Sequence, residues 1–385
     1  MFSFSFRRAM AVFVAALTLH VGGAAAAEPI RIGAILSVSG PGSLLGDPEA
    51  KVLKRYVKRI NGEGGVLGRK VELIVYDDES KAANSAAFAK RLIFNDKVDV
   101  ILGPSLTGNT MAVVPEVQEA KVPMISLAGG GVIVEPVKRW VFKTPHTDKM
   151  ATEQVFNDMK RRGIRQIALI YGTDGYGLSA SKATKELAST MGMTIAADET
   201  YAPNDVDMTT QLAKIKANPK VQAVFNLGFG RAAAIVTKDY RELGITLPFY
   251  ESHGVNSRSY IDLAGVDATE GVRLPGSALL VADAVPADDP QKATIMAFKK
   301  DFETAFKTEV STYGGYAYDA LQITLAAIQR AGSTDKEKVR DEIEKTSGYI
   351  GTTGIVHMSP EDHLGLDQAA LRMVEIRKGQ WKLVN

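Results

Sequence analysis

Short apolar runs alternate with longer amphipathic stretches along most of the chain. The first apolar run is Ile30–Leu36, residues 48–61 follow with a helical pattern, and Val71–Tyr76 is the next run. Strands that are apolar throughout and separated by helices predict a parallel sheet covered on both faces. The same pattern predicts three further elements in this part of the chain, a helix at residues 82–95 and strands at residues 98–102 and 122–126.

The alternation of strands and helices restarts near Met150. Two successive α/β units of like build predict two doubly wound lobes, and ligands bind beyond the carboxyl ends of the strands in such sheets. Two lobes that face each other would therefore form a cleft. The elements expected in the second half are strands at residues 166–171, 193–196, 221–225 and 247–250, helices at 293–307 and 316–331, and a hairpin formed by 371–377 and 380–384.

The amino terminus has the features of an export signal. Arg7 and Arg8 precede an apolar run at residues 9–19, and small residues lead to Ala25–Ala27. This order is typical of a signal peptide cleaved after residue 27. The run is about half of the roughly 20 residues that a membrane-spanning helix needs. Residues 1–27 are therefore expected to be a signal peptide, and the mature protein is expected in the periplasm, where ATP and NAD are scarce.

Composition narrows the classes of partner. The 385-residue chain carries a formal net charge of +2, which equals the charge of Arg7 and Arg8 in the predicted leader. A nearly neutral mature chain lacks the excess of positive charge that is typical of nucleic-acid-binding proteins. The chain contains no cysteine, so disulfides and thiolate metal sites are excluded.

Several motifs, in order along the chain, resemble those of periplasmic binding proteins of the branched-chain amino acid type, which serve ABC transporters. They include Asn61–Asp78, Gly103-Pro104, Asp174–Gly177 and Ala317–Ala320. The resemblance implies an α/β fold of two doubly wound parallel-sheet lobes joined by three crossovers, the type I periplasmic binding protein fold. It further implies a monomer without catalysis, cofactor or metal that docks on an ABC permease in the inner membrane. The lobes are expected at residues 28–148 plus 279–354 and at residues 149–278 plus 355–385.

The resemblance places the ligand carboxylate on the first lobe, at Thr107 and at the turn formed by Ala128, Gly129 and Gly130. Free N–H groups and a helix amino terminus favour an anion, and glycine allows close approach of the backbone. The alternative is that Thr107 caps its helix and the glycines only turn the chain. Gly130 stands where amino acid binders of the family usually carry threonine.

Three further positions match ligand contacts of the family. Tyr176 matches a tyrosine that reaches the ligand from the second lobe, and Phe229 matches an aromatic ring that covers it. A surface tyrosine and a core phenylalanine are the alternatives. Leu45 stands where some amino acid binders have tryptophan, which leaves room for a longer or flatter ligand.

The main departure from the family is His253. Amino acid binders have a carboxylate at this position, which pairs with the ligand ammonium, and an unpaired buried ammonium costs several kcal/mol. Glu251, two residues earlier, is the candidate replacement. The sequence thus predicts a small carboxylate without an α-amino group, such as a benzoate, phenylpropionate or cinnamate derivative. A keto acid, an amide, or a branched-chain or other amino acid are the alternatives.

Other classes of protein have weaker signals. Gly228–Ala233 follows a strand and opens a helix, as in dinucleotide-dependent enzymes, but it belongs to a late strand of an exported chain. The sequence contains no G-x-S-x-G motif, the nucleophile elbow that would indicate a hydrolase. His357 and His363 flank Glu361-Asp362, which we interpret as a polar surface turn rather than a metal site, and Asp77-Asp78 as a strand-end loop. A ligand sensor with the same fold is a further alternative, because no sequence motif distinguishes it from a transport protein.

Overall fold

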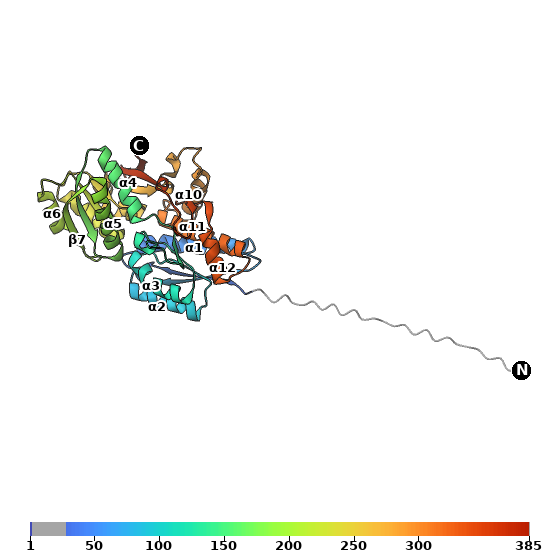
Figure 1. Cartoon of the computed structure of the whole chain (residues 1–385). Helices are drawn as coiled ribbons and strands as arrows, with labels where there is room; N and C mark the ends of the chain where they lie inside the picture. The colour runs from blue at the N-terminus through green and yellow to red at the C-terminus, as the bar shows by residue number, and fades with distance from the viewer. Residues whose placement is uncertain (2–27, 385) are drawn as a thin grey trace.

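The computed structural model describes Met1 and residues 28–384. Two large sheets, mainly of parallel strands, are packed against helices (Figure 1). The predicted signal peptide, apart from Met1, lies outside the described residues. In the part of the chain that is described, no helix is long and apolar enough to cross a bilayer.

The first sheet has the strand order β2-β1-β3-β4-β5, and every neighbouring pair is parallel. The interior strand β1 is almost entirely buried, because helices cover both faces. We call this sheet and the helices packed on it the first lobe. Its elements are β1 (Ile30–Leu36), α1 (Ser43–Gly62), β2 (Val71–Asp77), α2 (Ala82–Lys90) continued by a π-helical turn (Arg91–Asn95), β3 (Val100–Leu102), α3 (Thr107–Ala120), β4 (Met124–Ser126), a 3₁₀ turn (Gly131–Ile133), β5 (Val141–Lys143), α11 (Thr312–Ala331) and α12 (Lys336–Glu344).

The second sheet has the order β14-β13-β10-β9-β8-β6-β7 and defines the second lobe. It is mixed rather than parallel throughout, because β13 runs antiparallel to β10 and forms the predicted hairpin with β14. Its elements are α4 (Asp148–Arg161), β6 (Gln166–Gly172), α5 (Gly175–Met191), β7 (Thr194–Tyr201), α6 (Thr209–Ala217), β8 (Ala223–Leu227), α7 (Gly230–Glu242), β9 (Phe249–Glu251), a 3₁₀ turn (His253–Val255), α8 (Arg258–Ala264), α9 (Val266–Thr269), β10 (Arg273–Ser277), β13 (Leu371–Arg377) and β14 (Gln380–Leu383).

The chain passes between the two sheets three times, after β5, after β10 and before β13. This agrees with the expected fold class, and the residue limits of the lobes remain a prediction. Four elements lie along the second and third passages, namely a 3₁₀ segment (Ala278–Ala284), α10 (Lys292–Phe306), a two-stranded sheet of β11 (Ser347–Ile350) and β12 (Ile355–His357), and a 3₁₀ turn (Gln368–Ala370).

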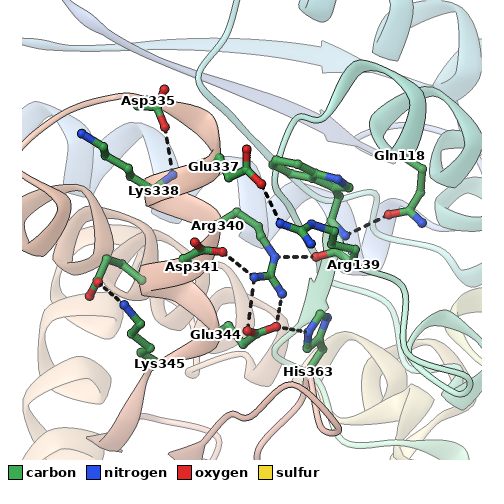
Figure 2. A network of polar contacts seen from close by, with 12 residues as sticks. Gln118, Arg139, Asp335, Glu337, Lys338, Arg340, Asp341, Glu344, Lys345 and His363 are labelled. Atoms are coloured by element: carbon green, nitrogen blue, oxygen red, sulfur yellow. Dashed lines mark hydrogen bonds and ion pairs between the residues drawn. The ribbon is translucent and has the colours of Figure 1, made fainter.

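A polar network ties the third passage to the first lobe (Figure 2). Arg340 on α12 donates to the carbonyl oxygen of Arg139 (2.9 Å) and pairs with Glu344. Glu344 Oε2, which also contacts Arg340, meets His363 Nε2 at 3.0 Å, and His363 Nδ1 lies 2.8 Å from the carbonyl oxygen of Val141. The segment after β12 is therefore fixed against β5, the edge strand that leads into the first passage.

Helix α1 and strand β7 both extend beyond their expected limits. Helix α1 begins at Ser43, five residues before Pro48, where the sequence pattern placed its start. Strand β7 continues to Tyr201 beyond the expected residues 193–196, because it is the half-exposed edge of the second sheet and tolerates polar side chains.

Candidate functional site

A cavity lies between the lobes at the carboxyl ends of the strands. The cavity is narrow, with a volume of about 30 Å³. A cavity of this size does not admit a polymer segment. It is lined by Leu45, Ser105, Leu106, Thr107, Leu127, Gly129, Pro145, Tyr176, Phe229, His253, Gly254, Tyr313 and Tyr316.

Five helices direct their amino termini toward this cavity. Thr107 is the first residue of α3, and Tyr176 and Tyr313 are the second residues of α5 and α11. Leu45 is the third residue of α1, and Phe229 immediately precedes α7. The first N–H groups of a helix have no partner within the helix, and they lie at the positive end of its dipole. In α5 the Asp174 carboxyl group accepts two of them, from Tyr176 (2.8 Å) and Gly177 (3.0 Å). The electrostatic field in the cavity therefore favours an anion.

The predicted carboxylate subsite on the first lobe is only partly exposed to the cavity. The Thr107 hydroxyl accepts the Gly130 N–H (3.1 Å) and still has a proton to donate, so it fixes the turn rather than capping α3. Gly129 lines the cavity, and its N–H has no acceptor among residues 28–384. Ala128 and Gly130 do not reach the wall, because the Ala128 N–H is taken by the Ser126 hydroxyl (3.2 Å) and Gly130 lies behind Thr107.

Aromatic side chains from both lobes form much of the cavity wall. The ring of Tyr176 is perpendicular to that of Phe229, with centroids 6.1 Å apart, and both residues line the cavity. Tyr313 and Tyr316, on the first turns of α11, were missed by the sequence reasoning. The Tyr316 hydroxyl is buried and has no partner among the described residues. Their signal was available, because two tyrosines one turn apart precede the motif Ala317–Ala320.

His253 lies at the centre of the cleft. Its Nδ1 is 3.4 Å from the Tyr176 hydroxyl, and Nε2 has no partner in the described structure. Nε2 points at the glycine turn, since a Cβ on Gly129 would approach it to 2.7 Å. Burial lowers the pKa of His253 to about 3, so the imidazole is neutral at ordinary pH. A neutral ring whose Nδ1 accepts from Tyr176 presents Nε2–H as a donor to the cavity.

Glu251 does not replace the missing carboxylate of the family. It does not line the cavity, and its oxygens accept hydrogen bonds from Asn226 (3.0 Å), the Thr237 hydroxyl (2.9 Å) and the Tyr260 hydroxyl (3.4 Å). This network holds the carboxyl group beneath β8 and β9. Burial raises the pKa of Glu251 to about 8, so it is protonated at neutral pH.

The raised pKa of Glu251 predicts a pH-dependent stability. Between about pH 4.5 and pH 8 the unfolded chain releases this proton and the folded chain retains it. The free energy of unfolding should therefore fall as pH rises through this window, by up to about 1.4 kcal/mol per pH unit. Glu251→Gln should flatten that slope, because the amide oxygen keeps the bonds to Thr237 and Tyr260. Urea unfolding at a series of pH values measures it, with the exposed Glu242→Gln as control; equal slopes in all three proteins would contradict the expectation.

A buried lysine behind the glycine turn was also missed. Lys143 ends β5, and its ammonium donates to the carbonyl oxygens of Gly129 (2.9 Å), Gly130 (3.3 Å) and His146 (3.3 Å). The side chain is fully buried. Its sequence context, Val141-Phe-Lys143, reads only as a strand end, so a lone lysine there gave no signal.

The lobes touch backbone to backbone beside the cavity. Gly175, the first residue of α5, packs so closely on the first lobe that a Cβ on it would lie 2.7 Å from the N and Cα atoms of Gly108. Gly230, with φ of +59°, packs on Pro41 in the same way, because a Cβ on Gly230 would lie 2.8 Å from the Pro41 carbonyl oxygen. The motif Gly228–Ala233 thus contributes to the contact between the lobes.

The remaining sequence candidates have structural roles. No cluster of three metal-ligating side chains occurs among the described residues. His357 is exposed, but His363 is buried against β5, so the expectation of a polar surface turn was wrong for His363. Asp78 is buried and accepts from the hydroxyls of Ser37 and Ser85, both at 2.7 Å, which stabilises the strand-end loop.

Comparisons with known proteins agree with this geometry. The model of the family described as "Periplasmic binding protein" matches residues 29–380. The chain is 25% identical over 333 residues to the leucine-, isoleucine-, valine-, threonine-, and alanine-binding protein of Pseudomonas aeruginosa, covering 85% of this chain and 86% of that protein.

Solved structures share the fold. An extracellular ligand-binding receptor from Rhodopseudomonas palustris HaA2 is 30% identical, with a TM-score of 0.86 over 93% of this chain and 100% of its own. The branched-chain amino acid transporter substrate binding protein LivJ of Streptococcus pneumoniae, in complex with isoleucine, is similar in fold. It is 23% identical, with a TM-score of 0.82 over 93% of this chain and 99% of its own.

Proposed function

The chain belongs to the family of periplasmic binding proteins, and we propose that it captures a small carboxylate without an α-amino group for an ABC importer. It is an extracytoplasmic solute-binding protein of the Leu/Ile/Val-binding type and not an enzyme. The finer proposal concerns its ligand, for which an aromatic acid such as a benzoate, phenylpropionate or cinnamate derivative is the first choice.

One observation carries this proposal. Five helix amino termini point at the cavity, and no aspartate or glutamate is among the residues that line it. An anionic end of a ligand is therefore stabilised, whereas an ammonium group has no acidic partner. His253 is neutral and Glu251 is turned away, so neither supplies the negative charge that an α-amino group requires.

The mechanism we propose begins on the first lobe. The ligand carboxylate binds the Thr107 hydroxyl and the Gly129 N–H, and a planar or branched body lies between Leu45 and the aromatic wall. Closure then brings Tyr176, Phe229 and His253 of the second lobe over the ligand. Contacts from both lobes stabilise the closed form, which the permease in the inner membrane recognises in the monomeric protein.

An α-amino acid is the second candidate, favoured by the amino acids after which the Pseudomonas relative is named. A matched pair separates the two, because leucine and 4-methyl-2-oxopentanoate differ only in the ammonium or carbonyl group on the α carbon. A thermal shift and calorimetry panel should include this pair with benzoate, 3-phenylpropionate, cinnamate and phenylalanine.

We expect at least one of the four carboxylates without an amino group to raise the melting temperature, and to bind at least about 100-fold tighter than leucine or phenylalanine. Benzamide and cinnamamide control for the negative charge. The proposal is abandoned if leucine stabilises the protein more than its keto acid and more than every aromatic acid.

A further inference from the structure

The turn that faces the cavity is held from behind by a single buried cation. The three hydrogen bonds of the Lys143 ammonium go to carbonyl oxygens of Gly129, Gly130 and His146, and the side chain is completely buried. Because a lysine ammonium has three donors, these contacts use all of them.

The positive charge of Lys143 has no ion-pair partner among residues 28–384. Asp148 is the nearest candidate, but its Oδ1 accepts the N–H groups of Gly131 (3.1 Å) and Lys149 (2.8 Å), and its Oδ2 accepts the Ser179 hydroxyl (2.5 Å). A buried cation bound only by carbonyl dipoles lacks the compensation that buried charges usually have. An anion on the cavity side of the turn would supply it.

The lysine also sets the direction of two N–H groups in the turn, those of Gly130 and Gly131. In a trans peptide the C=O of one residue and the N–H of the next point in opposite directions. Lys143 binds the Gly129 carbonyl, so the Gly130 N–H points away from it, toward the Thr107 hydroxyl at 3.1 Å. The same cation thus fixes the turn and places positive charge directly behind the carboxylate subsite.

We propose that Lys143 is the buried charge that selects an anionic ligand in the cleft and orients the Gly129-Gly130 turn that receives it. The inference rests on the proposed function, because it explains how a carboxylate is distinguished from an uncharged molecule of the same shape. Lys143 acts through the turn and through its field, and is a positioning residue rather than a direct contact.

The surroundings of the ammonium predict that binding is coupled to a proton. Burial lowers the pKa of Lys143 to about 7, while the carboxylates of Asp148 and Glu135 act in the opposite direction. Two imidazoles also face it, and both are uncharged, since burial lowers the pKa of His146 to about 4 and that of His253 to about 3. An arriving anion should therefore favour the protonated lysine.

The test uses the full mature protein with benzoate, 3-phenylpropionate and cinnamate as probes and the corresponding amides as uncharged partners. Calorimetry of the wild type at pH 8, in buffers of different ionisation enthalpy, should show uptake of a proton on binding. The acid affinity should fall as pH rises from 6 to 9. Lys143→Met should weaken acid binding at least about 10-fold and abolish the proton uptake, with a smaller effect on the amides.

Lys143→Arg, which keeps its charge at all these pH values, should restore acid binding and remove its pH dependence. If Lys143 is merely structural, the Met variant should lose acid and amide affinity equally, and the wild type should take up no proton on binding. This result overturns the inference and leaves the proposed function intact. If neither these acids nor 4-methyl-2-oxopentanoate binds the wild type, the proposed function is wrong and the inference falls with it.

Discussion

Replacing His253 by aspartate should turn the protein into a receptor for α-amino acids. The imidazole lies at the centre of the cleft, is neutral, and directs Nε2 at the turn that receives the ligand carboxylate. A carboxylate there would pair with a ligand ammonium that has no partner in the wild type. Leucine or phenylalanine binding should improve at least about 100-fold, since breaking or leaving such a buried pair incomplete costs several kcal/mol.

The same substitution should weaken the binding of simple carboxylates, because two negative charges would then share a small buried cavity. His253→Asn is the matched control, since asparagine has the shape of aspartate without its charge. Isothermal calorimetry with leucine and with 4-methyl-2-oxopentanoate on the three proteins measures both effects. If the asparagine and aspartate variants bind leucine equally, then charge at this position does not decide the ligand class.

Gly175→Ala should hold the lobes apart. The added Cβ would lie 2.7 Å from the backbone of Gly108, and backbone atoms on both sides leave no flexible side chain to move away. The first position of α5 accepts alanine readily in the separated lobe. Ligand affinity should therefore fall at least about 10-fold, while the free energy of unfolding without ligand changes by less than about 1 kcal/mol.

The contact itself provides the control for this substitution. A Cβ on Gly108 would meet Gly175 at 3.7 Å, an ordinary van der Waals distance, so Gly108→Ala should close normally. Small-angle scattering with and without ligand reports closure as a decrease in the radius of gyration. A Gly175→Ala protein that contracts and binds like the wild type would show that the closed contact adjusts more easily than the two backbones suggest.

The alternation of apolar runs was sufficient to predict most of the architecture. Strand β1 is observed at the predicted residues Ile30–Leu36, and the carboxyl-terminal hairpin is confirmed, because buried strands and turn glycines leave a strong periodic pattern. Element ends were less predictable. Helix α11 begins at Thr312, four residues before the expected start at Tyr316, since Gly314 and Gly315 interrupt the helical pattern.

The candidate site was predictable where a residue carries a family motif or unusual chemistry. Thr107, Tyr176 and His253 meet around one cavity although they are far apart in the sequence. Lys143 could not be found in this way. Its ammonium binds three carbonyl groups that lie elsewhere in the chain. The sequence does not indicate which backbone oxygens a side chain will contact. Ala128 is the opposite case, a residue that the motif predicted as a ligand contact. Its N–H donates to the Ser126 hydroxyl and is therefore not free to bind a ligand.

The direct contact between Gly108 and Gly175 has a consequence for transport. Side chains between two lobes can change rotamer and so allow several degrees of closure, but two bare backbones touch at only one spacing. A molecule too long for the cavity would keep these glycines apart, even if its carboxylate bound normally to the first lobe. Such a molecule would occupy the receptor without producing the shape that the permease accepts, and would act as a competitive inhibitor of uptake rather than as cargo.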